Sequence, residues 1–228
     1  MPVSLDARSA DFEARFAELL AGKRETSVDV ADAVAAILDE VRRDGDAALI
    51  RLTAKFDRQE LTPATLRVSA AEIAAAEAAC APELLEALDL AAARIRSFHE
   101  KQLPEDLSYT DAVGARLGLR WTAVDAAGLY VPGGTASYPS SVLMNAIPAK
   151  VAGVARLVMV VPMPGGAVNP LVLAAAKRAG VDEIYRVGGA QAVGALAYGT
   201  ATIRPVDKIV GPGNAYVATA KRMVFGTV

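Results

Sequence analysis

Four short apolar runs in the second half of the chain, each followed by a helical pattern, constrain the fold most. The runs begin at positions 128, 157, 184 and 208, so successive starts lie 29, 27 and 24 residues apart. This spacing suits repeated strand–helix units whose right-handed crossovers build a parallel sheet. The expected strands are Gly128–Val131, Leu157–Val161, Ile184–Val187 and Lys208–Val210, and the expected helices are Ser140–Val154, Pro170–Ala179, Ala190–Tyr198 and Ala215–Phe225.

Each expected strand runs into a glycine-rich turn: PGG at 132–134, PGG at 164–166, GGAQ at 188–191 and GPGN at 211–214. Glycine allows sharp turns and a close approach of the backbone to a ligand. Open α/β sheets bind ligands at the carboxyl ends of their strands, where helix N-termini also favour anions. Turn geometry alone explains one such loop, but four at the same edge, one with Gln191 and one with Asn214, favour a binding site.

The glycine spacing nevertheless excludes a standard dinucleotide fingerprint. The run 188–194 has its glycines at the wrong intervals, and the run 211–216 lacks the third glycine of G-x-G-x-x-G. No P-loop is present either. The second half is therefore expected to be Rossmann-like without the usual fingerprint.

The first half has the texture of packed amphipathic helices. A capping box at Ser69–Glu72 opens one of them, and Gly114 divides two alternating runs that predict a β hairpin or two edge strands. The expected helices are 11–21, ended by Gly22, then 28–43, 45–56, one opening at Ser69, and 83–102. We therefore expect two domains: residues 1–126, a helical region with a hairpin that further sequence completes, and residues 127–228, a nucleotide-binding βα domain.

Composition excludes several classes of function. Lys and Arg number 24 against 26 Asp and Glu, which gives a net charge of −2 and argues against nucleic acid as a partner. Cys80 and His99 are the only residues of their types, too few for a structural zinc site. Both are best explained as helix packing residues, so no catalytic or metal-binding residue is assigned. The lone cysteine, the polar N-terminal segment and the absence of a long apolar run predict a cytoplasmic protein without a membrane span.

Four motifs, in order along the chain, resemble histidinol dehydrogenase: GLYVPGG at 128–134, YPSSVLMNAIPA at 138–149, GGAQAVGALAYG at 188–199 and DKIVGPGNAYV at 207–217. The resemblance implies oxidation of L-histidinol to L-histidine through L-histidinal with two NAD⁺ and zinc, an aldehyde dehydrogenase-like fold and an intertwined homodimer. It also carries the family's nucleotide contacts onto Tyr130, Gln191 and Asn214. The two amides can donate and accept hydrogen bonds to ribose or phosphate. The alternative is that these side chains only stabilise their turns, and the motif matches favour the binding role.

The resemblance places the family's zinc ligands and its Glu–His acid–base pair beyond Val228. The chain is therefore expected to be an N-terminal portion of a histidinol dehydrogenase that is not catalytically competent alone. The alternative is a nucleotide-binding or scaffolding module without turnover. A weaker alternative is an acyl-phosphate reductase of the aldehyde dehydrogenase-like group, for which Cys80 is badly placed as a nucleophile.

Overall fold

The computed structural model describes residues 3–133, 138–167 and 169–228, with side chains for all of these except 21–29. A four-stranded sheet lies at its centre, and every paired neighbour in that sheet is parallel. The strands are β3 (Ala126–Tyr130), β4 (Arg156–Val160), β5 (Glu183–Tyr185) and β6 (Lys208–Val210). The predicted α/β class with a parallel sheet is confirmed, and each strand lies within a few residues of its expected position.

The order of the strands, β5-β4-β3-β6, places the last strand beside the first. Helices α5 (Pro139–Val151) and α6 (Pro170–Ala179) connect neighbouring strands, whereas α7 (Gly189–Tyr198) carries the chain back across the sheet to β6. After β3 the chain enters α5 on one face, and after β6 it enters α8 (Ala215–Met223) on the other. The carboxyl ends of β3 and β6 therefore flank the point at which open α/β sheets bind their ligands.

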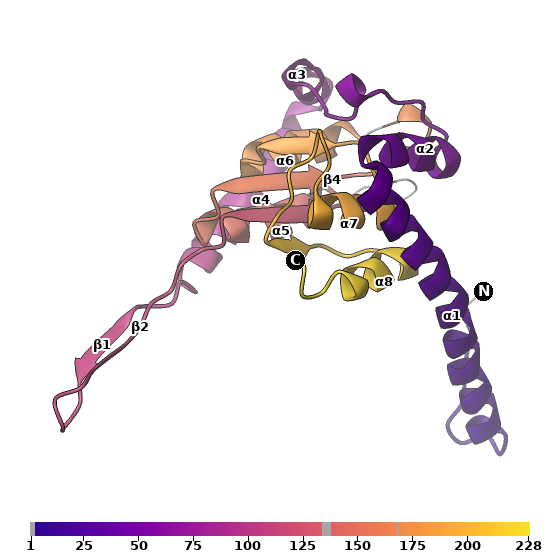
Figure 1. The fold of residues 1–228 in the computed structure, drawn as a ribbon, viewed down its shortest axis with the longest axis horizontal. Coiled ribbons are helices and arrows are strands. Elements are labelled where there is room, and N and C mark those ends of the chain that lie inside the picture. Colours follow the sequence, from indigo (N-terminus) through magenta and orange to yellow (C-terminus); the bar gives the residue numbers. More distant parts are fainter. Residues whose placement is uncertain (1–2, 134–137, 168) are drawn as a thin grey trace.

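Alternate residues of each strand face two separate hydrophobic cores. Along β4, Val158 and Val160 belong to the core shared with α7 and α8, while Leu157 and Met159 belong to the core shared with α5 and α6. Successive strand side chains point to opposite faces, so both faces of this sheet must be covered. The helices do so, and β3 is buried along its whole length (Figure 1).

The N-terminal helices add an outer layer on both faces. Helices α1 (Phe12–Asp44) and α2 (Asp46–Asp57) pack on α7, and α1 also contacts α8. On the other face, α3 (Ala70–Ala78) packs on α6, and α4 (Pro82–Glu100) packs on α5 and α6. The short 3₁₀ turns η1 (Pro63–Thr65) and η2 (Pro164–Gly166) complete the helical elements of the described residues. Both cores contain residues from either side of position 126, and the domain division at 126/127 stays a prediction.

Helix α1 runs without interruption through Gly22, where the sequence pattern predicts a helix end, so that prediction was wrong. A glycine inside a helix costs only about 1 kcal/mol relative to alanine. The later part of the same helix is held by tertiary packing, since Val34 and Val41 are fully buried in the core with α7. The chain instead turns at Gly45, whose φ of +56° separates α1 from α2.

The predicted hairpin is present and projects away from the sheet (Figure 1). Strands β1 (Leu107–Thr110) and β2 (Arg116–Leu119) pair antiparallel, and all their residues are exposed. Gly114 lies in the connecting turn, where the Asp111 carboxylate accepts hydrogen bonds from the backbone N–H groups of Val113 and Ala115.

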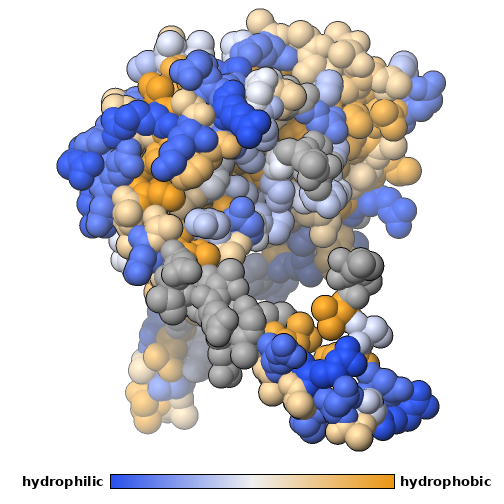
Figure 2. Space-filling view, turned by 90° about the vertical axis from the view of Figure 1, so that its right-hand side faces the viewer, coloured by the Kyte–Doolittle hydropathy of each residue, from blue (hydrophilic) through white to orange (hydrophobic). Residues whose placement is uncertain are grey.

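The face of the molecule that carries α1 mixes hydrophilic and hydrophobic residues without separating them into large zones (Figure 2). Among the described residues, no helix combines the length and the apolar character needed to cross a membrane.

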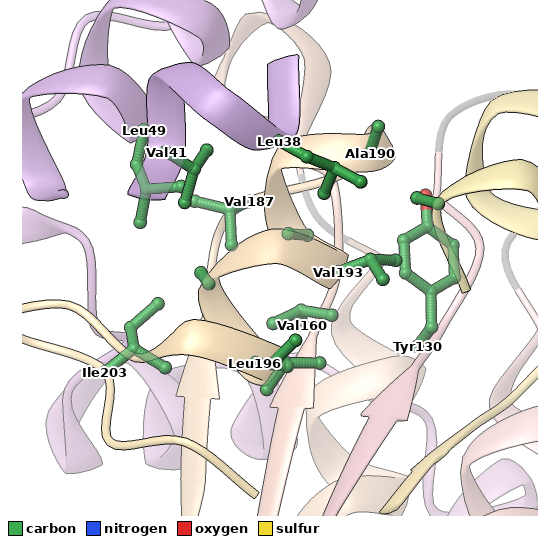
Figure 3. Close-up of a cluster of buried hydrophobic side chains, with 14 of the residues drawn as sticks. Leu38, Val41, Leu49, Tyr130, Val160, Val187, Ala190, Val193, Leu196 and Ile203 are labelled. Carbon is green, nitrogen blue, oxygen red and sulfur yellow. The ribbon is translucent and has the colours of Figure 1, made fainter. Parts of the chain in front are cut away.

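Helix α7 is seated on the sheet through Leu196, which is fully buried and packs directly over Gly128 of β3 (Figure 3). We expect Leu196→Ala to lower the free energy of unfolding by about 2–5 kcal/mol, because the lost side chain leaves a cavity. Denaturant-induced unfolding followed by circular dichroism measures this loss. The control Leu90→Ala, at a position 63% exposed on α4, should change stability by less than about 0.5 kcal/mol. Equal effects of the two substitutions would contradict the packing of Leu196 against the sheet.

Candidate functional site

A cavity of about 540 Å³ opens at the carboxyl edge of the sheet. Its walls come from the ends of β3 and β4, from the first turns of α7 and α8, and from α1 and α2. The lining residues are Ile37, Phe56, Asp57, Tyr130, Pro132, Gly133, Pro162, Pro164, Gly189, Ala190, Gln191, Asn214 and Tyr216. All three residues that the sequence analysis selected, Tyr130, Gln191 and Asn214, therefore lie in one cavity.

Tyr130 joins the sheet to the first turn of α7. It is the last residue of β3, and strand alternation directs its side chain to the face that α7 covers (Figure 3). The ring is only 4% exposed, and its hydroxyl oxygen accepts a hydrogen bond of 3.1 Å from the backbone N–H of Gly189. Burial raises the pKa of the Tyr130 hydroxyl, and the nearby Asp57 carboxylate raises it further. Tyr130 therefore stays protonated and fixes where α7 begins.

Gln191 lies in the first turn of α7 and is 1% exposed. Gly189 makes room for it: its φ is +63°, and a Cβ there would lie 2.6 Å from the Gln191 Oε1 atom. The Gln191 side chain makes no hydrogen bond to the residues that the structure describes. It brings both a donor and an acceptor to the cavity wall.

Asn214 is the N-cap of α8, and its Oδ1 atom accepts a hydrogen bond of 3.1 Å from the backbone N–H of Val217. The turn-stabilising role considered from the sequence is therefore present. Capping uses only the acceptor of the amide. The Asn214 NH₂ group donates to none of the described residues and is available as a donor in the cavity wall.

Gly211 brings the turn after β6 against the end of β3. Its φ is +111°, and a Cβ there would overlap the carbonyl oxygen of Tyr130. Lys221 Nζ donates a hydrogen bond of 3.2 Å to the Gly211 carbonyl oxygen. Only glycine allows this approach, which holds the Asn214 turn beside Tyr130.

Sequence reasoning missed the contribution of the N-terminal helices to the cavity. Ile37, Phe56 and Asp57 line it, although they precede Tyr130 by more than seventy residues. The Asp57 Oδ2 atom is buried and has no hydrogen-bond partner among the residues that the structure describes, and burial raises the pKa of this carboxyl. Nothing in the local sequence marks these residues, because their position depends on how α1 and α2 pack over α7.

The cavity combines features suited to a ligand that carries both anionic and hydroxyl groups. The N-termini of α7 and α8 face it, and the free N–H groups of a helix N-terminus favour anions. Among the described lining residues, Asp57 is the only charged side chain.

The other residues weighed in the sequence lie outside this cavity. His99, near the end of α4, packs its ring edge-on against Phe98. The Cys80 thiol donates to the Ala76 carbonyl oxygen at 3.2 Å. Within the described parts of the chain, no group of three His, Cys, Asp or Glu side chains could hold a metal ion. Gly134 of the GLYVPGG motif lies outside the described residues.

Comparison with known proteins agrees with the motifs. A sequence model of histidinol dehydrogenase matches residues 21–228. The chain belongs to the histidinol dehydrogenase family. It is 68% identical over 228 residues to the histidinol dehydrogenase of Bradyrhizobium diazoefficiens and equally to that of Rhodospirillum rubrum, covering all of this chain and 53% and 52% of those proteins.

The structural comparison shows the same family. The crystal structure of histidinol dehydrogenase from Elizabethkingia anophelis matches with a TM-score of 0.82 at 38% identity, over 86% of this chain and 45% of that one. The chain thus spans about half the length of the curated histidinol dehydrogenases that it matches.

The burial of Asp57 gives a stability prediction. A raised pKa means that the folded protein binds the Asp57 proton more tightly than the unfolded chain, so stability present in acid is lost as pH rises through the raised pKa. We expect Asp57→Asn to melt at or above the wild-type temperature at pH 7. The difference should shrink as pH falls toward the ordinary carboxyl pKa of 3.8.

Scanning calorimetry between pH 4 and pH 7 measures this difference. The control Glu60→Gln removes an exposed carboxylate three residues away and should not change the melting temperature relative to wild type. A variant at position 57 that melts several degrees lower at pH 7 would contradict the burial of an unpartnered charge.

Proposed function

We propose that the cavity binds NAD⁺ and that the chain supplies the nucleotide-binding part of an enzyme that oxidises L-histidinol to L-histidine through L-histidinal. The observation that carries the proposal is the convergence of Tyr130, Gln191 and Asn214 in one cavity at the strand-order reversal between β3 and β6. The cavity supports the proposal by its position, and the family relationship supports the substrate.

The backbone of α7 offers a place for the pyrophosphate. The Ala190 and Gln191 N–H groups belong to its first turn, where amides lack partners within the helix. The hydrogen bond from Gly189 to Tyr130 holds that turn against the sheet. In this proposal the Gln191 amide and the Asn214 NH₂ group bind sugar hydroxyl or phosphate oxygens. When bound, NAD⁺ would accept hydride from the carbon that is oxidised.

The family resemblance also implies zinc, but the described residues do not fit it. The proposal places the zinc ligands in the family sequence that this chain does not span. The proposal includes a cytoplasmic location, which suits a biosynthetic enzyme.

Calorimetric titration with NAD⁺ tests the proposal. Tyr130→Phe removes the hydroxyl that positions α7, and we expect it to weaken NAD⁺ binding about fivefold, the equivalent of roughly 1 kcal/mol. The matched control is Tyr185→Phe. The Tyr185 hydroxyl is bonded to Glu183 and to the Thr202 carbonyl oxygen, away from the cavity, so its loss should leave NAD⁺ affinity unchanged. Equal weakening by both substitutions would contradict the assigned site.

NADH formation from L-histidinol, followed at 340 nm with zinc supplied, distinguishes enzyme from binding module. We expect the chain alone to bind NAD⁺ without turnover, and a protein of full family length carrying this sequence to reduce it. Steady turnover by the chain alone would contradict the proposal that this chain binds NAD⁺ but lacks the catalytic residues. Binding without turnover in the full-length protein would favour the scaffolding alternative.

We propose further that the protein forms a homodimer, supported by the β1–β2 hairpin. Leu107 faces Leu119 and Tyr109 faces Leu117 across the pair, so these four side chains share one face of the ribbon. They are between 44% and 54% exposed. A lone two-stranded hairpin is only marginally stable in water, and a second copy of the chain would cover this apolar face.

Sedimentation equilibrium tests the dimer. We expect the wild-type protein to sediment as a dimer and the double variant Leu107→Ser, Leu119→Ser to shift toward monomer. The control is Ser108→Ala with Thr110→Ala on the opposite face of the same strand, which should remain dimeric. A monomeric wild type, or equal effects of the two double variants, would overturn the assignment of this face.

A further inference from the structure

Asp57 stands out among the residues that line the cavity. It is the last residue of α2, where a carboxylate lies at the unfavourable end of the helix dipole. The next residue, Arg58, turns the chain through a left-handed conformation with φ +53°. The Asp57 Oδ2 atom is buried without a partner in the described parts of the chain. Leaving a buried acceptor unpaired costs free energy, which a hydrogen-bond donor on a ligand would recover.

The chemistry of the cavity indicates which group of a ligand donates this hydrogen bond to Asp57. A carboxylate only accepts hydrogen bonds and repels phosphate. Phosphate is instead favoured at the first turns of α7 and α8. Phe56, the residue before Asp57, also lines the cavity and is 50% exposed, and Ile37 adds a second apolar side chain to the lining. Such apolar side chains suit the face of a base. A sugar that is attached to a base and carries two adjacent hydroxyls fits this part of the cavity.

We propose that Asp57 accepts hydrogen bonds from the 2′- and 3′-hydroxyls of the adenosine ribose and thereby selects NAD⁺ against its 2′-phosphorylated form. The inference rests on the proposed function of the cavity. A 2′-phosphate removes one donor and places negative charge beside a buried carboxylate. The loss of a good hydrogen bond and the repulsion act in the same direction.

Calorimetric titration of the purified protein with NAD⁺, NADP⁺ and 2′-deoxy-NAD⁺ tests the inference. For the wild type we expect NADP⁺ to bind about 100-fold more weakly than NAD⁺, and 2′-deoxy-NAD⁺ about tenfold more weakly. Asp57→Asn keeps the shape of the side chain but removes its charge. It should reduce the ratio of the NADP⁺ dissociation constant to the NAD⁺ dissociation constant at least tenfold, mainly by strengthening NADP⁺ binding. Asp57→Ala should narrow the ratio in the same direction and lose the penalty for 2′-deoxy-NAD⁺.

The control Glu60→Gln removes a nearby carboxylate that does not line the cavity, and it should keep the wild-type ratio. If all variants bind NAD⁺ but the Asp57 variants keep the wild-type ratio of NADP⁺ to NAD⁺ dissociation constants, the inference is wrong and the proposed nucleotide site stands. If the folded wild type binds neither dinucleotide, the proposed function fails and this inference fails with it.

Discussion

The parallel pairing of β6 with β3 is the constraint on which the candidate site depends. It aligns Ala127 with Lys208 and Leu129 with Val210, so the two strands end at the same edge. Gly211 lets the turn after β6 close against Tyr130. If β6 paired anywhere else in the sheet, the first turns of α7 and α8 would not face the same cavity. The reversal in strand order therefore determines where the cavity lies, and the side chains determine what it can bind.

Helix α7 packs against both the sheet and the outer layer of helices. On its inner side Leu196 packs over Gly128, and on its outer side Gly194 admits Leu38 and Val41 of α1. One helix thus packs between the sheet and the N-terminal helices while its first turn forms a wall of the cavity. The same packing brings Asp57, at the end of α2, into the wall of the cavity. The site is consequently built from both halves of the sequence.

Local sequence patterns predicted much of this structure, because strands and turns depend mainly on residues that are close together in the sequence. The spacing of apolar runs predicted the four strands, and the glycine-rich turns predicted the edge at which Gln191 and Asn214 lie. Tyr130 was selected only through the family resemblance. Strand order was not predictable in this way, because the return of the chain through α7 leaves no mark in the spacing. Helix α1 was misjudged because tertiary packing outweighed the cost of Gly22. Asp57 was missed because its place in the cavity depends on contacts between distant segments.

We propose that a dinucleotide occupies the cavity between the ends of β3 and β6. A crystal structure of the protein with NAD⁺ bound would show whether it does. We expect density for the pyrophosphate at the first turn of α7, with the Gln191 and Asn214 amides within hydrogen-bond distance of the ligand. Well-ordered NAD⁺ at any other position, with this cavity filled only by water, would show that the proposed site is wrong.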